Sequence, residues 1–121
     1  MSNPIATPVT LAYRRQVALS AKTGAAISPA AFMAFGSSAA PYSADDDTAL
    51  YAEFARVAVQ TTVDGPVLSV KGVLTGDLAG DHVLREVAVF TQSGVLMGRR
   101  VVKAKEFELG SEIEFELEFE Y

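Results

Sequence analysis

The residues that could do chemistry in this chain are few, and they lack the partners that a reaction needs. His82 is the single histidine, and the chain has no cysteine. A metal site would need further imidazole or thiolate ligands, and a hydrolytic triad would need His82 beside an activated serine. The serines occur in no nucleophile-elbow pattern. We therefore expect His82 to be a surface residue, and we expect no catalytic residue, no metal site and no cofactor.

Three consecutive carboxylates, Asp45-Asp46-Asp47, are the second candidate. A calcium-binding loop spreads its ligands at defined spacings around a central glycine and ends in a bidentate glutamate. None of these features surrounds the run, which indicates a solvated loop. No glycine-rich phosphate-binding motif is present either.

Glu86 is the third candidate because it shares a strand face with Leu84, Ala88 and Phe90. A charge on an apolar face is costly unless it is paired. Arg56, on another predicted strand, is the candidate partner, and a half-buried salt bridge between them would fix the strand register. The alternative is a catalytic carboxylate, although no second acid–base group lies nearby in the sequence.

The last ten residues, 112–121, alternate glutamate with an apolar or aromatic residue at every position. This period of two predicts a strand, because successive side chains of a strand point to opposite faces. One face would line the core, and the other would present five carboxylates. Such a face could bind a basic partner or a cation, or it could simply be solvated.

Three basic residues of the preceding strand, Arg99, Lys103 and Lys105, share one parity and hence one face. If that strand pairs with the last one, each exposed cross-strand ion pair would contribute about 0.2–1 kcal/mol. The double change K103E/K105E would then lower stability. The glutamates that these bases would face are Glu112, Glu114 and Glu116.

Length and composition indicate a small acidic globular protein. The chain has 121 residues, of which 50% are hydrophobic and 21% charged, and its net charge is −5. These values suit one domain with a modest core. The acidity disfavours nucleic acid and anionic membrane surfaces as partners. No signal peptide or membrane-spanning run is recognisable, so we expect a soluble protein made in the cytoplasm.

The elements that position these residues begin with an extended arm, 1–9, which holds two prolines. The remainder, 10–121, is expected to be a single mainly-β domain. Helical spacing of Tyr13, Val17 and Ala21 predicts a short helix over 11–21, with an early strand as the alternative. Gly24 would end either element.

The rest of the chain is typical of antiparallel strands joined by short turns. An apolar run predicts a buried strand, and a polar stretch after it predicts a flexible loop. Asp64-Gly65 is a hairpin signal between two strands. The fold class is therefore α+β, mainly β: an antiparallel sheet or sandwich of about five or six strands with a short N-terminal helix. The predicted strands are 31–35, 56–62, 67–74, 83–91, 95–105 and 112–121, and the predicted loops include 37–48 and 75–81.

Four short motifs, in this order, resemble one known family. They are Met33-Ala34-Phe35-Gly36, then Leu50, Glu53 and Arg56 at spacing three, then Arg85-Glu86-Val87-Ala88-Val89-Phe90, then a turn at Gly94 before Val95-Leu96. Together they resemble the N-terminal, baseplate-attaching region of the phage tail-collar fibre protein family, over roughly residues 11–121. The family's turn after the first strand is usually glycine-aspartate-glycine, whereas this chain has Gly36-Ser37-Ser38.

The resemblance implies a structural component of a phage or phage-like tail, without enzymatic activity. Such a protein would act by non-covalent assembly with other tail or baseplate proteins and would reside in the virion tail. Tail appendages are often homotrimers, so by analogy we also expect this chain to form a homo-oligomer, a trimer. The alternative is a small β-type module that binds a ligand or a carbohydrate without catalysis. The chain has no tryptophan, and Tyr42 is the aromatic residue of its polar loop.

Overall fold

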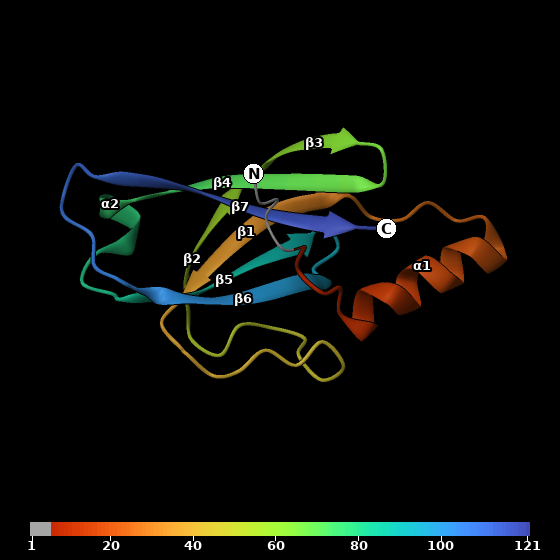
Figure 1. Cartoon of the computed structure of the whole chain (residues 1–121), viewed down its shortest axis with the longest axis horizontal. Coiled ribbons are helices and arrows are strands. Elements are labelled where there is room, and N and C mark those ends of the chain that lie inside the picture. Colours follow the sequence, from red (N-terminus) through yellow and green to blue (C-terminus); the bar gives the residue numbers. More distant parts are fainter. Residues whose placement is uncertain (1–5) are drawn as a thin grey trace.

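The computed structural model describes residues 6–121, so residues 1–5 of the predicted arm lie outside the described residues. Two antiparallel sheets face each other, one with strand order β2-β1-β5-β6 and the other with order β3-β4-β7 (Figure 1). The elements are α1 (Leu11–Thr23), β1 (Ala30–Gly36), β2 (Glu53–Ala58), β3 (Gln60–Asp64), β4 (Val67–Thr75), α2 (Gly76–Ala79), β5 (Leu84–Thr91), β6 (Leu96–Lys105) and β7 (Glu112–Glu120). The predicted mainly-β antiparallel fold with a short N-terminal helix is confirmed.

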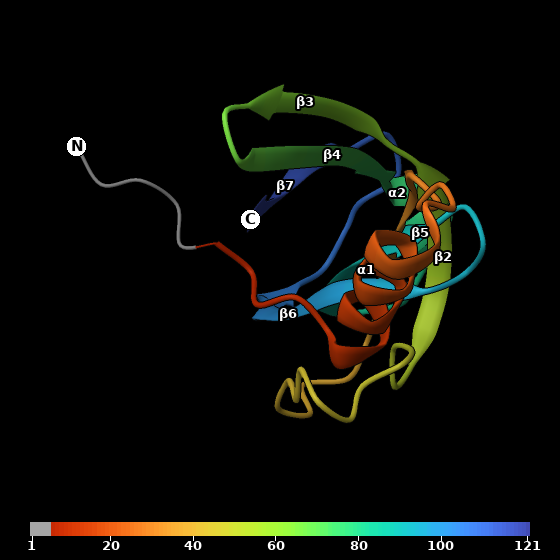
Figure 2. The same ribbon diagram turned by 90° about the vertical axis from the view of Figure 1, so that its right-hand side faces the viewer.

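One predicted strand, 56–62, is in fact two, so residues 6–121 contain seven strands. The chain pairs with β1 as β2, passes through Val59, and then pairs with β4 as β3. The Val59 N–H donates to the Ala31 carbonyl at 3.2 Å, which holds the bend. The chain thereby passes from one sheet into the other without a loop (Figure 2).

The helix α1 forms where the spacing predicted it, and the alternative of an early strand is wrong. The Thr10 hydroxyl accepts a hydrogen bond from the Tyr13 N–H at 3.1 Å, which caps the first turn. Gly24, with φ of 74°, ends the helix in the left-handed conformation. None of the helix residues is buried. Within residues 6–121, no helix is long and apolar enough to cross a membrane.

The core lies between the two sheets. β7 pairs with β4, which places Leu117 beside Val70 and Phe119 beside Leu68 on the inner face. Leu117 and Phe119 are buried, so the apolar side of the last strand lines the core as predicted. The other main contributors to this core are Met33, Phe35, Leu74, Val87, Val89 and Met97.

The predicted pairing of β6 with β7 is wrong, because the two strands belong to different sheets. Pairing with β4 lets β7 bury its apolar face against a strand that is also apolar on that side. The N-terminal segment connects β7 and β6 by hydrogen bonds to both strands. The Thr7 N–H donates to the Glu118 carbonyl of β7 at 2.7 Å, and the Thr10 N–H donates to the Met97 carbonyl of β6 at 2.9 Å. The basic residues Arg99, Lys103 and Lys105 therefore do not oppose Glu112, Glu114 and Glu116 across a strand pair.

A candidate site beneath the 37–52 loop

A buried ion pair lies on the outer face of the four-stranded sheet. The Arg99 Nε donates to the Glu86 Oε1 at 2.8 Å, and both side chains are 0% exposed. The pair forms because β5 and β6 are neighbours and Ala88 stands opposite Arg99. The loop 37–52 joins β1 to β2 and passes over this face, on the side away from the three-stranded sheet (Figure 1, Figure 2). The loop thus shields both charges from water.

The Glu86 carboxylate holds both ends of the loop 37–52. Its Oε2 accepts from the Ser38 N–H at 3.1 Å and from the Ala52 N–H at 2.8 Å, and its Oε1 accepts from the Tyr51 N–H at 3.0 Å. Gly36 leaves the space for this carboxylate. A Cβ at position 36 would collide with it and would stand 2.7 Å from the Ala52 carbonyl oxygen.

Arg99 binds the first part of the same loop and lies close to Asp47 in its middle. Its Nη1 donates to the Ala40 carbonyl at 2.7 Å and its Nη2 to the Ser38 carbonyl at 3.3 Å. The Asp47 carboxylate lies 3.9 Å from Nη1, and the Tyr51 ring centroid is 4.7 Å from the guanidinium carbon. One cation is therefore shared by two carboxylates and stacked on an aromatic ring, which is the geometry that arginine supports better than lysine.

The environment of Glu86 fixes its charge state. Burial by itself raises the pKa of Glu86, but the Arg99 hydrogen bond and the three backbone N–H groups outweigh burial and lower it below its usual value. The carboxylate is thus ionised, and four protein donors occupy the acceptor sites of its two oxygens. It has no free lone pair with which to take a proton from a substrate. The arrangement is suited to holding the loop.

Two tyrosine hydroxyls hold the loop, one by a contact within it and one by a contact with the N-terminal segment. The Tyr51 hydroxyl donates to Asp47 Oδ1 at 2.7 Å, and this hydrogen bond raises the pKa of Tyr51. The Tyr42 hydroxyl donates to the Pro8 carbonyl at 2.6 Å. Burial, together with the Asp47 charge, raises the pKa of Tyr42 to about 12. Both hydroxyls therefore remain protonated donors at neutral pH.

The aspartate run is only partly the solvated loop that we predicted. Asp45 and Asp46 are exposed, but Asp47 is buried and accepts from the Ser43 N–H at 3.0 Å. Asp47 differs from its neighbours because Arg99 and Tyr51 stand close enough to compensate its charge. Across residues 6–121 no cluster of three or more histidine, cysteine, aspartate or glutamate side chains has a geometry for holding a metal ion.

The predicted ion pair between Glu86 and Arg56 is not formed. Arg56 instead binds Glu53, with its Nε and Nη2 at 3.0 and 2.9 Å from the carboxylate oxygens. Its guanidinium carbon lies 4.2 Å from the Phe90 ring centroid. Arg56 reaches across β1 as far as the Phe90 ring of β5, but Glu53 holds its guanidinium, whereas Arg99 projects from the strand directly beside Glu86.

His82 is exposed, as predicted, and its ring stacks on Phe54 with 4.6 Å between the ring centroids.

On the outer face of the three-stranded sheet, Lys71 Nζ lies 3.8 Å from Glu116 Oε2. The Ser69 hydroxyl donates to Glu118 at 3.4 Å. The glutamate face of β7 is therefore an open surface with one nearby base from β4.

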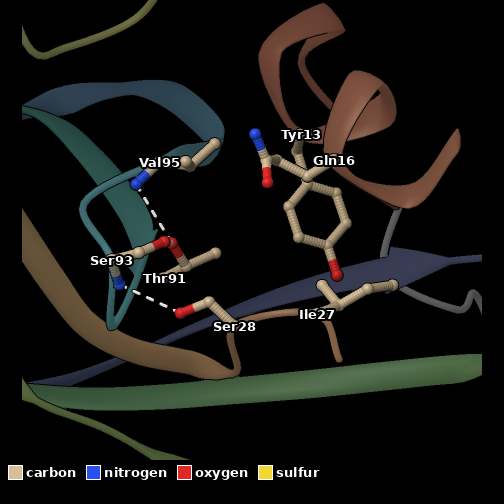
Figure 3. Close-up of a pocket in the computed structure, with 7 residues that line it drawn as sticks. All are labelled: Tyr13, Gln16, Ile27, Ser28, Thr91, Ser93 and Val95. Carbon is tan, nitrogen blue, oxygen red and sulfur yellow. Dashed lines mark hydrogen bonds between the residues drawn. The ribbon is translucent and has the colours of Figure 1, made fainter. Parts of the chain in front are cut away.

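A small pocket lies where α1 meets the turn between β5 and β6 (Figure 3). The Ser93 N–H donates to Ser28 Oγ at 2.9 Å and the Val95 N–H to Thr91 Oγ1 at 3.0 Å, so two of its hydroxyl groups stabilise the turn itself. Its cavity volume of about 10 Å³ leaves room for about one water molecule and is far below the roughly 300 Å³ at which ligand pockets usually begin. The residues that line it are Tyr13, Gln16, Ile27, Ser28, Thr91, Ser93 and Val95.

Comparison of the chain with protein-family models, with curated proteins and with solved structures found no match.

Proposed function

We propose that this protein is a structural component of a phage or phage-like tail, which attaches non-covalently to other tail or baseplate proteins. The observation that carries the proposal is where the four tail-collar-like motifs lie. They are separated in the sequence, yet they fall on β1, on β2 and the loop before it, on β5, and on the turn into β6, and these four strands form one sheet. The resemblance thus concerns one structural unit and not scattered positions.

The motif residues also contact one another. Leu50, from the loop, packs against the cluster of Ala34, Ala88, Phe90 and Leu96 on the outer face of this sheet. The motif residue Glu86 supplies the carboxylate that holds the loop. A set of residues that maintains a loop on a sheet is what a rigid attachment surface requires.

Attachment is favoured over catalysis by what the buried pair does. A loop that is already ordered loses little conformational entropy when a partner binds to it, and preorganisation of this kind raises affinity. Glu86 and Arg99 order the loop 37–52 through five hydrogen bonds to its backbone. We therefore assign the exposed side of this loop as the surface that meets the tail.

The proposal is tested by mass spectrometry of purified tail particles from the strain that encodes the chain. We expect the protein in the particles, and we expect Thr48→Arg, an exposed loop change, to reduce its incorporation. Leu109→Arg is the matched control, because Leu109 is 88% exposed in the loop before β7. Absence of the wild-type protein from the particles would overturn the proposed function. Normal incorporation of the Thr48 variant would overturn the loop as the contact surface.

A further inference from the structure

β2 and β3 are the two edge strands to which the described N-terminal residues make no backbone hydrogen bond, and β3 is the one of the two whose residues are all exposed. At the edges of the other two outer strands, the Thr7 N–H binds the backbone of β7 and the Thr10 N–H binds the backbone of β6. β3 pairs with β4 on one side, and no described residue pairs with its other side. All five residues of β3 are exposed, and Val63 is 73% exposed. β4 lies between β3 and β7, so β3 forms the outer strand of this sheet (Figure 2).

The turn of this hairpin determines which backbone groups are free. Gly65, with φ of 58°, occupies the first central position of a two-residue turn, and Asp64 pairs with Val67 across it. A pair that closes such a turn is hydrogen-bonded, and hydrogen-bonded pairs alternate along an antiparallel ladder. The N–H and C=O groups of Thr61 and Val63 therefore point to the open edge.

We propose that a second copy of the chain binds at this edge, with the two β3 strands antiparallel about a twofold axis at Thr62. In this register Thr61 of each copy faces Val63 of the other, and the free N–H and C=O groups of these residues form four hydrogen bonds. Thr62 faces its own counterpart in a non-hydrogen-bonded pair. The two three-stranded sheets then become one continuous sheet of six strands.

The charges of the strand favour a second copy in this register. The outer face of β3 carries Gln60, Thr62 and Asp64, so each strand contributes a single charge. The antiparallel arrangement places Asp64 opposite Gln60 of the second copy. Lys71 stands beside that Gln60 in β4 and is the nearest base on the same face. Two strand spacings, about 9.6 Å, separate the backbones of Asp64 and Lys71, a span that a lysine and an aspartate side chain can bridge between them.

The composition of β3 agrees with strand pairing. Natural edge strands avoid association through lysine, proline, bulges or inward-pointing charges, and β3 has none of these. Its inward side presents Val63 next to Leu68. Pairing covers Val63 with Thr61 of the second copy and removes an exposed apolar side chain from water. Like-charge repulsion would oppose the same arrangement at β7, where every second residue is glutamate.

The proposal is tested by sedimentation velocity of the purified chain over a concentration series up to the millimolar range. We expect a reversible dimer. Thr62→Lys and Thr62→Glu should each weaken dimerisation about fivefold, because equal charges meet at the axis. An equal mixture of the two variants should restore the wild-type dimer, since opposite charges then meet. Leu109→Lys is the matched control and should dimerise as the wild type does.

A second variant tests the backbone contacts. Val63→Pro removes an N–H that points to the open edge and leaves the ladder with β4 intact, so it should weaken the dimer more than Thr62→Lys does. A monomeric wild type over the whole concentration range would overturn the proposal. A dimer that forms equally well in the Thr62 variants and in Val63→Pro would also overturn it. The same holds for a trimer, the oligomer that the resemblance implies, if these variants leave it unchanged. The proposal does not depend on a role in a tail, and its failure would leave that role untouched.

Discussion

The outer faces of the two sheets carry charges in opposite environments. On the four-stranded sheet, Glu86 and Arg99 are fully buried under the loop 37–52. Both carboxylate oxygens of Glu86 and all three guanidinium nitrogens of Arg99 have hydrogen-bonding partners. On the three-stranded sheet, the glutamates of β7 face solvent, and Lys71 is the base that lies within 3.8 Å of Glu116. Charged residues thus hold a loop in place on the four-stranded sheet, whereas on the three-stranded sheet they form a hydrated surface.

The difference shows what decides the structural value of a charge. An exposed ion pair contributes about 0–1 kcal/mol, because water solvates the separated ions almost as well. Removing one member of a buried pair leaves the other charged and without compensation, which destabilises by about 3–5 kcal/mol. Matched substitutions on the two faces measure this contrast directly.

The largest effect is expected for Glu86→Gln. The change leaves Arg99 without its anionic partner and places an amide group where backbone N–H groups and the guanidinium need an acceptor. We expect the free energy of unfolding to fall by about 3–5 kcal/mol in urea titrations. The control is Glu114→Gln, the same chemical change on the open face, for which we expect a change within about 0.5 kcal/mol. Equal effects of the two substitutions would contradict the contrast.

The next effect concerns the space above Gly36. Gly36→Ala places a methyl group against the Glu86 carboxylate and 2.7 Å from the Ala52 carbonyl oxygen. Because both groups are held by hydrogen bonds, we expect a loss of about 1–3 kcal/mol. In a Glu86→Ala background part of the collision is absent, so the cost of Gly36→Ala should be smaller there. A double-mutant cycle by urea denaturation measures this coupling, and strict additivity of the two changes would refute the close approach.

The buried pair also predicts how stability depends on pH. The pKa of Glu86 is lower in the folded protein than the ordinary value of 4.5. The unfolded state therefore binds the proton more readily, and the stabilisation from Glu86 is fully present above the unfolded pKa. It is lost as the pH falls through the folded pKa. We expect the stability difference between wild type and Glu86→Gln to be constant near neutrality and to shrink below about pH 4. Denaturant titrations over this pH range measure it, and a difference that grows on acidification would reverse the assigned sign.

The sequence allowed part of this site to be predicted. Glu86 lies on an apolar strand face, so its burial and its need for a cation follow from periodicity alone. Its partner does not follow. Counting residues back from the β5–β6 turn places Arg99 on the face opposite to that of Glu86, and only a register shift between Val89 and Phe90 brings Ala88 opposite Arg99. Such a bulge leaves no periodic signal in the sequence.

The strand order explains the remaining differences. Local patterns indicate where strands run but not which of them are neighbours, since pairing depends on contacts between residues far apart in the chain. β6 and β7 are consecutive and oppositely charged, which suggested a pair, yet the core requires β7 beside β4. The division of 56–62 into β2 and β3 is of the same kind, because a continuous β-prone run contains no mark of the point where it changes sheets.

The smallest expected effect tests that strand order. If β6 paired with β7, the double change K103E/K105E would remove favourable cross-strand contacts and oppose like charges, and stability would fall by a kcal/mol or more in total. In the structure both lysines are exposed on a sheet that does not contain β7. We therefore expect a change within about 0.5 kcal/mol.

Lys71→Glu is the informative comparison, because Lys71 does stand across from Glu116 on the neighbouring strand. It should destabilise by up to about 1 kcal/mol, and less at high salt, where the charges are screened. If urea denaturation ranked the two variants in the opposite order, the placement of β7 beside β4 would be in error.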